Sequence, residues 1–205
     1  MLTFDSKYRE KGFVNLCGCD EAGRGPLAGP VVAAAVLFSA NKNIVGVNDS
    51  KKLTEKMREK LFPEIKEQAD AYAYKVISPN RIDEINILQA SLEGMRLSVN
   101  ELNILPNMIL IDGNKTFHST IQREAIVKGD SKSFVIACAS IIAKVTRDNI
   151  MMELAKEHPA YGWDHNKGYP TKDHIRAVLK YGPTKYHRKS FLKNITKWEQ
   201  DGLYK

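Results

Sequence analysis

The sequence predicts an α/β fold in which one sheet is covered by helices. Short apolar segments bounded by glycine and proline alternate with longer segments of helical periodicity, and such alternation is typical of this class. Three of the predicted strands also end in carboxylates. The 205 residues suffice for one domain with a full core, or for a core with a small appendage.

In the first part of the chain, residues 13–19 and 31–38 are predicted strands that are joined by a connection rich in glycine and proline. Thr54 is a good N-cap for a helix that runs toward residue 69. Pro63 is expected to kink or split that helix, since proline lacks an N–H. A third strand is predicted at 71–77.

The second part begins with a helix. Ser78 and Pro79 have the pattern of an N-cap followed by proline at the first helical position. The apolar stripe of this helix has spacings of four, three, four and three and consists of Leu88, Leu92, Met95, Val99 and Leu102. Short strands are predicted at 108–111 and 125–127, a long helix at 133–158 and a last helix at 171–181.

Composition excludes several classes of protein. The apolar runs are too short to span a bilayer, so no membrane association is expected, and the N-terminus lacks the apolar core of a signal peptide. The three cysteines, Cys17, Cys19 and Cys138, are odd in number, which indicates a reducing compartment rather than a disulfide framework. A cytoplasmic protein without a zinc site is expected.

The net charge of +7 is unevenly distributed. Residues 164–205 contain ten Lys and Arg against four Asp and Glu, so the positive excess lies almost entirely in this C-terminal part. Such asymmetry predicts contact with a polyanion, although a solvated basic surface would give the same count.

Carboxylates stand at the ends of three predicted strands, as Asp20 with Glu21, as Asp112 and as Asp130. Ligands of open α/β sheets bind near strand ends, and carboxylate oxygens are the ligands that Mg²⁺ prefers. Taken singly, Asp112 could belong to an ordinary turn and Asp130 could cap the next helix. One convergent acidic cluster is the more economical account of all three.

Four carboxylates within a few ångströms would repel one another, and their pKa values would rise unless a cation were bound. Two Mg²⁺ ions about 4 Å apart can activate a water and stabilise the leaving oxygen in phosphodiester hydrolysis. Adjacent residues of a strand point to opposite faces. We therefore expect either that the first strand ends at Asp20 or that a bulge turns Glu21 inward.

Gly23, Arg24 and Gly25 follow the acidic pair directly. Glycine permits a close approach of the backbone to a ligand, and arginine in this place indicates a phosphate or a ribose. A plain strand-to-turn junction would contain the same residue types. The chain has no P-loop and no complete dinucleotide fingerprint, which disfavours a nucleoside-triphosphate enzyme.

Seven segments in one order give the chain a resemblance to the type 2 ribonucleases H (ribonuclease HII) over nearly its whole length. They are GCDEAGRGPLAGPVV at 18–32, NDSKKL at 48–53, ILIDGN at 109–114, VKGDSKS at 127–133, SIIAKVTRD at 140–148, NKGYPT at 166–171 and HRKSF at 187–191. The resemblance implies a ribonuclease H-like fold with a mixed central sheet flanked by helices. It implies a catalytic core at 1–160, and a basic helical C-terminal region at 161–205 that packs on the core and contributes to substrate binding.

The resemblance also implies an endonuclease for the RNA strand of RNA/DNA hybrids, which cuts 5′ to single ribonucleotides in duplex DNA and so removes ribonucleotides during replication and repair. The residues that match the family's catalytic carboxylates, and that would hold Mg²⁺ or Mn²⁺, with two ions during catalysis, are Asp20, Glu21, Asp112 and Asp130. Nothing in the sequence signals an obligate protein partner, and a monomer is expected.

Substrate contacts are implied in the same way. Gly23, Arg24 and Gly25 match the element whose backbone contacts the ribose 2′-hydroxyl. Tyr169 matches the tyrosine that senses the ribose-to-deoxyribose junction, although a half-buried structural tyrosine would look the same.

For several other polar residues the sequence gives only weak indications of a contact with the substrate. Lys51 lies in a predicted loop and could contact phosphate. Lys144 and Arg147 share a face of the long helix, and a solvated surface is an equal alternative for both. His165 and His187 could touch phosphate, but the sequence offers neither of them a partner.

Two rival interpretations remain. The type 3 ribonucleases H share much of the pattern, but they carry an extra N-terminal domain and typically Gly-Lys-Gly at 23–25. A catalytically silent nucleic-acid binder on the same fold would lack one of the acidic residues, and all four are present.

Overall fold

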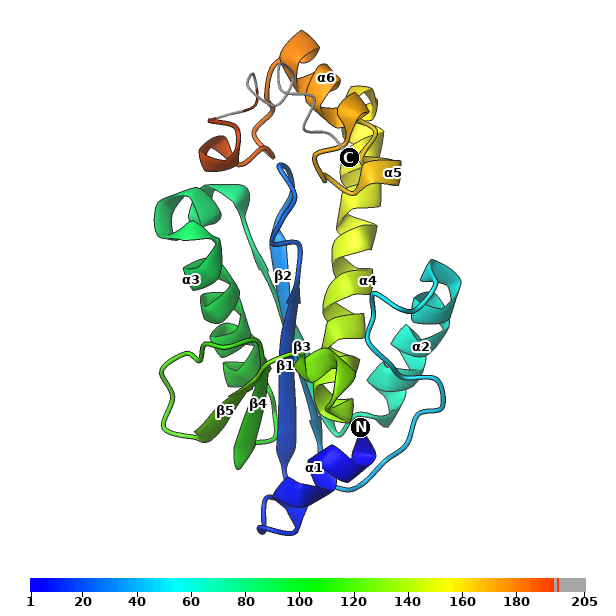
Figure 1. The fold of residues 1–205 in the computed structure, drawn as a ribbon, viewed down its shortest axis with the longest axis vertical. Coiled ribbons are helices and arrows are strands. Elements are labelled where there is room, and N and C mark those ends of the chain that lie inside the picture. Colours follow the sequence, from blue (N-terminus) through cyan, green and yellow to red (C-terminus); the bar gives the residue numbers. More distant parts are fainter. Residues whose placement is uncertain (194, 196–205) are drawn as a thin grey trace.

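The computed structural model describes residues 1–193 and 195, and one five-stranded mixed sheet forms its centre (Figure 1). The strand order is β3-β2-β1-β4-β5, with β1 at Leu16–Ala22, β2 at Val31–Phe38, β3 at Ala71–Ile77, β4 at Met108–Asp112 and β5 at Gln122–Ile126. β2 is antiparallel to both of its neighbours, whereas β1, β4 and β5 run parallel. The prediction of a mixed sheet is confirmed.

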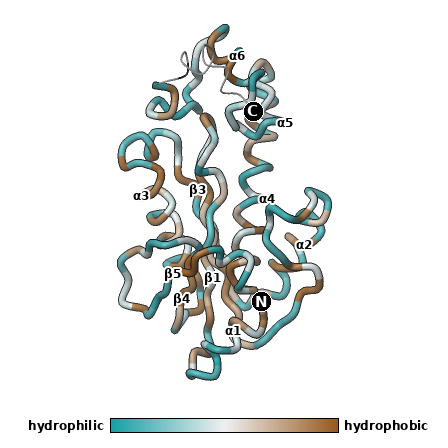
Figure 2. The backbone as a smooth tube through the Cα atoms, in the orientation of Figure 1, coloured by the Kyte–Doolittle hydropathy of each residue, from teal (hydrophilic) through white to brown (hydrophobic). Residues whose placement is uncertain are grey.

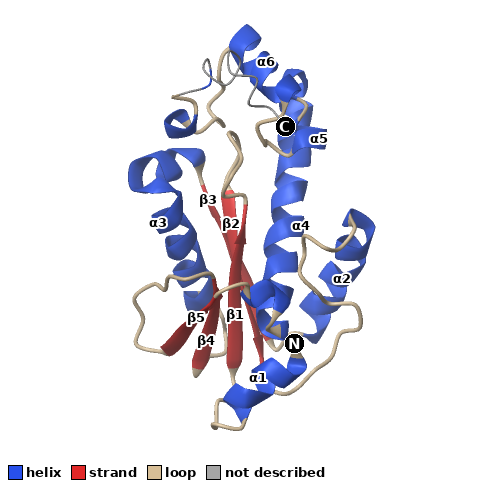
Figure 3. Cartoon of the chain, in the orientation of Figure 1, coloured by secondary structure: helices blue, strands red, loops and turns tan. Residues whose placement is uncertain are grey.

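Helices cover both faces of this sheet (Figure 3). α3 (Pro79–Asn100) lies on one face and α4 (Phe134–Glu157) on the other, while α2 (Glu55–Gln68) packs against α4 and α1 (Leu2–Arg9) lies near the start of β1. Every residue of β2 is buried, as expected for a central strand between two helical layers. Hydrophobic segments accordingly gather along the sheet and the helices that face it (Figure 2).

The two faces of β1 and β4 follow from strand alternation. Leu16 and Leu110 join the core cluster that contains the α4 residues, whereas Cys17 and Ile109 pack with residues of α3. Gly18 lies on the α4 face, and a Cβ there would overlap the backbone of Val135. The absence of a side chain thus lets α4 lie directly against β1, close to the end of the strand.

The predicted helix starts are confirmed by their caps. In each case the side-chain oxygen of the N-cap residue accepts a hydrogen bond from the backbone N–H three residues later, which satisfies a donor that the helix leaves free. The capping residues are Thr54, Ser78, Ser133 and Thr171.

Some element boundaries differ from the prediction. β1 starts at Leu16 and continues to Ala22, and β5 starts before residue 125. α2 is one helix through Pro63, because the carbonyl that loses its N–H partner belongs to the exposed Glu59. The interruption lies in α3, where Asn86 has φ 66° and its Oδ1 accepts the N–H groups of Leu88 and Gln89.

Beyond α4 the chain forms α5 (Trp163–Asn166) and α6 (Lys172–Tyr181). They pack at the end of α4 around the buried Tyr161 and Trp163, whose rings are stacked with centroids 5.1 Å apart. A division at residue 160 stays a prediction, and residues 194 and 196–205 of the predicted C-terminal region lie outside the described residues. Across the part of the chain that the structure describes, no helix has the length and apolar character needed to span a membrane.

Candidate metal centre and the adjoining pocket

Three of the predicted carboxylates meet where β1 and β4 end. Asp112 is the last residue of β4, and Asp20 lies on the neighbouring parallel strand β1, two residues before that strand ends. Asp130 lies in the 3₁₀ turn Gly129–Ser131 that precedes α4. Each offers a carboxylate oxygen, and these atoms lie within 4.8 Å of one another. Asp20 and Asp112 continue the alternation of Gly18 and Leu110, so both face α4.

Backbone donors hold two of these carboxylates in place. Oδ1 of Asp112 accepts the N–H of Gly129 at 2.6 Å and, at a longer 3.4 Å, that of Asp130. Asp112 therefore anchors the turn that carries Asp130. Oδ1 of Asp20 accepts the N–H of Glu21 at 2.7 Å.

The electrostatics of the cluster favour a bound cation. Burial, and then the charges of Glu21 and Asp112, raise the pKa of Asp20 well above its usual range. Burial, and then Asp112 and Asp49, raise the pKa of Asp130, although Lys51 opposes this shift. Three oxygen ligands in mutual repulsion form a donor set suited to a hard divalent ion.

Glu21 does not lie within this group of three. β1 stays in unbroken register with β2 through Asp20, Glu21 and Ala22, so neither the strand end nor the bulge expected from the sequence occurs. Glu21 nevertheless lines the same cavity as Ser140 and Lys144 of α4. Its carboxylate pairs with Nη1 of Arg24 at 3.4 Å. Its pKa is raised by burial first, and Asp112 adds to the shift while Arg24 opposes it.

Lys51 stands beside the cluster. Its Nζ lies 3.5 Å from Oδ2 of Asp130, and its side chain is 80% exposed. The N–H of Lys51 donates to Oδ1 of Asp49 at 2.9 Å, and Ser50 bonds Ser140 of α4 through their hydroxyl oxygens at 2.8 Å. The loop that carries Lys51 is thus fastened to the helix next to the carboxylates.

A small cavity of about 180 Å³ adjoins the carboxylates. Gly23, Arg24 and Gly25 line it together with Tyr169, and a Cβ on Gly25 would lie 3.5 Å from Cε1 of Tyr169. Its other lining residues are Glu21, Ala22, Ser50, Lys51, Ser140 and Lys144. The structure therefore gathers all the predicted substrate-contact residues into one pocket.

The remaining polar candidates differ in burial and in the groups that they contact. His165 has an 89% exposed side chain and pairs with Asp164, whereas His187 is buried with its Nε2 3.2 Å from that of His174. Lys144 pairs with Asp148 at 2.8 Å. The solvated alternative is wrong for Arg147, which is 1% exposed.

Sequence reasoning missed Arg188, which is fully buried and donates hydrogen bonds to carbonyls of the segment 23–30. Its only signal was a place in the HRKSF segment.

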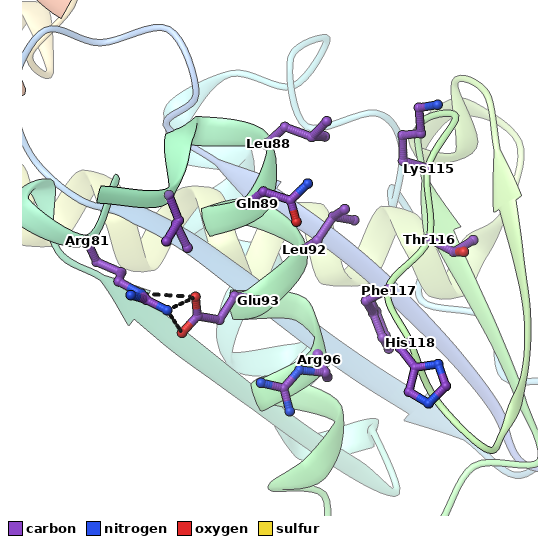
Figure 4. A pocket seen from close by; sticks show the side chains of 11 residues that line it. Arg81, Leu88, Gln89, Leu92, Glu93, Arg96, Lys115, Thr116, Phe117 and His118 are labelled. Carbon is purple, nitrogen blue, oxygen red and sulfur yellow. Dashed lines mark hydrogen bonds and ion pairs between the residues drawn. The ribbon is translucent and has the colours of Figure 1, made fainter. Parts of the chain in front are cut away.

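A larger hollow of about 770 Å³ lies between α3 and the β4–β5 loop, with Arg81 paired to Glu93 on its wall (Figure 4). None of the sequence-predicted site residues lines it.

Comparison with known proteins gives one consistent result. Residues 17–194 match the family model described as ribonuclease HII. The ribonuclease HII of Caldicellulosiruptor bescii is 49% identical over 191 residues, which are 93% of each chain. The ribonuclease H2 crystal structure from Pyrococcus horikoshii OT3 has a TM-score of 0.74 at 30% identity, and the match covers 91% of this chain and 98% of that one.

The type 3 rival is more distant. Bst RNase HIII in complex with Mn²⁺ has a TM-score of 0.66 and 19% identity, covering 93% of this chain and 70% of that one, which shows a shared fold. The family model and the 49% identical relative both indicate ribonuclease HII, and the acidic cluster is of the kind that such a metal-dependent nuclease needs. The chain belongs to the ribonuclease HII family of divalent-metal-dependent nucleases.

Proposed function

We propose that this protein is an endonuclease that cleaves the RNA strand of RNA/DNA hybrids and cuts duplex DNA on the 5′ side of a single embedded ribonucleotide. The observation that carries the proposal is the placement of Asp20, Asp112 and Asp130 within 4.8 Å of one another, next to the pocket of Gly23, Gly25 and Tyr169. The carboxylates would lie at the cleaved phosphate, and the pocket would contact the sugar and distinguish ribose from deoxyribose.

The chemistry rests on the carboxylates. Asp20, Asp112 and Asp130 would hold Mg²⁺ or Mn²⁺, and bound ions would activate a water and stabilise the leaving oxygen. We propose that Glu21 joins this set, with two ions during catalysis, because its carboxylate lines the cavity beside the three aspartates. Lys51 would lie close to the phosphate that the carboxylates address.

Substrate selection rests on the pocket. The 2′-hydroxyl distinguishes RNA from DNA at a given nucleotide. The backbone of Gly23, Arg24 and Gly25 would contact it, since the glycines leave room for close approach. Tyr169 is 42% exposed, so its ring is available to pack on the next sugar, and the basic residues beyond 160 would contact phosphates.

The direct test uses labelled duplex DNA with one ribonucleotide, with Mg²⁺ or Mn²⁺ in separate reactions. We expect a single cut 5′ to the ribonucleotide and no cut in the matched all-DNA duplex. Binding without cleavage by the folded, metal-loaded protein would instead favour the silent nucleic-acid binder.

Tyr169 gives a second test. Tyr169→Ala should lower kcat/KM on the single-ribonucleotide duplex with little change in melting temperature, because the ring lies at the surface and belongs to no hydrophobic core cluster of the described residues. Tyr169→Phe should retain part of the activity, because it keeps the flat face. Wild-type cleavage by Tyr169→Ala would remove this residue from the site.

We further propose that the protein acts as a monomer in the cytoplasm. Its three cysteines are buried and free, which agrees with a reducing compartment. Light scattering of the purified chain would measure its mass in solution.

A further inference from the structure

Two guanidinium groups, those of Arg147 and Arg188, lie buried beneath the segment 23–30. They are 1% and 0% exposed. Within residues 1–193 and 195, neither forms an ion pair, and every hydrogen bond that they donate goes to a backbone carbonyl. Buried charges are normally paired with an opposite charge, so this arrangement calls for an explanation.

Arg188 contacts the Gly-Arg-Gly element itself. Its Nη2 donates to the carbonyl oxygen of Gly23 at 2.6 Å, and its Nη1 donates to that of Arg24 at 3.0 Å. The same guanidinium donates to Gly29 at 3.0 Å and to Pro30 at 3.1 Å. One side chain from the C-terminal region thus holds both ends of the 23–30 segment.

Arg147 completes the arrangement from α4. Its Nε donates to the carbonyl of Pro30 at 3.0 Å, and its Nη2 donates to those of Ala28 and Lys167. A Cβ on Gly23 would overlap the Arg147 side chain. The glycine at 23 is therefore required by the arginine behind it as well as by φ +97°.

The direction of these carbonyls fixes the direction of the neighbouring amides. In a planar trans peptide the C=O and the following N–H point to opposite sides. The carbonyls of Gly23 and Arg24 point inward to Arg188, so the N–H groups of Arg24 and Gly25 point outward. In the described part of the chain these two amides have no hydrogen-bond partner, and both residues line the pocket.

The arrangement has a cost. Burial, and then the charge of Arg147, lower the pKa of Arg188. Among the residues that the structure describes, Nη1 of Arg147 is buried without a hydrogen-bond partner. Two buried like charges lying close together do not favour stability by themselves. Together, however, they bind the carbonyl oxygens of the segment 23–30 and so hold these carbonyls pointing inward.

We infer that Arg188 is a positioning residue for recognition of the 2′-hydroxyl, acting through the peptide units of Gly23 and Arg24. It orients the N–H groups of Arg24 and Gly25 as two fixed donors toward the oxygen of that hydroxyl. Arg147 supports the same segment from behind. The inference rests on the proposed function, and it names the side chain that presents the sugar-reading surface.

The test removes the guanidinium and then returns it in solution. Arg188→Ala leaves a buried space for free guanidinium, which is added as its chloride at millimolar concentration. Two probes are used, a duplex with one ribonucleotide and the identical all-DNA duplex, bound in Ca²⁺. Arg123→Ala is the matched control, because Arg123 also donates to backbone carbonyls, those of Ser119 and Ile121, but lies on β5.

We expect Arg188→Ala to lose most of the binding preference for the ribonucleotide duplex and about 10- to 100-fold in kcat/KM, the scale of a misplaced binding group. Added guanidinium should restore both. Mn²⁺ affinity without nucleic acid should stay at the wild-type value, because the carboxylates are untouched. Arg123→Ala should keep the wild-type preference.

A wild-type preference in folded Arg188→Ala would overturn the inference, and so would a loss that guanidinium does not reverse. If Arg188→Ala does not fold, Arg188→Lys decides, since lysine has at most three donors for four carbonyls. A wild-type preference in that variant would equally overturn it. If the wild-type chain itself shows no preference for the ribonucleotide, the proposed function fails instead.

Discussion

The two charged clusters on either side of Gly23–Gly25 are built in opposite ways. The acidic cluster of Asp20, Asp112 and Asp130 places like charges within 4.8 Å, with few donors to offset them. In the basic cluster, the guanidiniums of Arg147 and Arg188 are surrounded by backbone carbonyls. The acidic cluster is therefore incomplete without an external cation, whereas the basic cluster needs no ligand and serves to shape the backbone.

The largest expected effect comes from Asp20→Asn. We expect cleavage to fall by roughly 10²–10³-fold or more, as when a central electrostatic group is removed. Stability without metal should hold or rise, because a buried repelling charge disappears. Turnover and melting temperature are measured together, with Glu153→Gln as the control, since that side chain is 70% exposed on α4. A substantially active Asp20→Asn would refute the assignment of the acidic cluster.

The second largest loss of activity is expected for Gly23→Ala, in the loop between the two clusters. In Gly23→Ala the new Cβ would overlap Arg147 and would sit at φ +97°. We expect about a hundredfold loss in kcat/KM on the ribonucleotide duplex, with Mn²⁺ affinity retained. Gly12→Ala is a matched control, because Gly12 has φ +93° with free space around it. Equal effects of the two substitutions would show that backbone strain alone is responsible.

Without metal, the repulsion within the acidic cluster should make the free energy of unfolding depend on pH. The pKa values of Asp20, Glu21 and Asp130 are raised in the folded protein. Between the unfolded and folded pKa values the folded state holds more protons, so the free energy of unfolding falls as pH rises through the raised values. Each unit of difference contributes about 1.4 kcal/mol. The loss should appear in EDTA and shrink with Mg²⁺, as measured by urea unfolding from pH 4 upward. A flat profile in EDTA would contradict the burial of these charges.

The smallest effect is expected for Lys51→Ala. Burial lowers the pKa of Lys51, but the surrounding carboxylates, Asp130 first, together raise it, so the side chain stays charged. Because it is 80% exposed, its loss should cost only a few-fold in activity, in keeping with an exposed ion pair. The salt dependence of binding should become shallower by about one unit of slope if Lys51 contacts a phosphate. Lys60→Ala on the exposed side of α2 is the control.

Sequence patterns predicted the strands at 31–38 and 71–77, the N-caps Thr54 and Ser78 and the starts of the helices near residues 133 and 171, because these depend on local residue types. They also predicted that Asp20, Asp112 and Asp130 would meet, although only Asp112 ends a strand, while Asp20 lies within β1 and Asp130 in the turn before α4. The position of Glu21 was out of reach, since it depends on whether β1 continues in register past Asp20. Arg147 and Arg188 were missed as buried groups because arginine is normally exposed, and only the fold brings carbonyls around them.

The 24 residues of α4 bear on every part of the site. The helix starts shortly after Asp130 and packs against Gly18. It carries Ser140, which bonds the Lys51 loop, and Arg147, which lies under the segment 23–30, and it ends in the aromatic cluster. One residue added within it would turn everything downstream by about 100° and shift it by about 1.5 Å. We therefore expect an insertion or deletion between residues 134 and 157 to disturb the site far more than one of the same length in a surface loop.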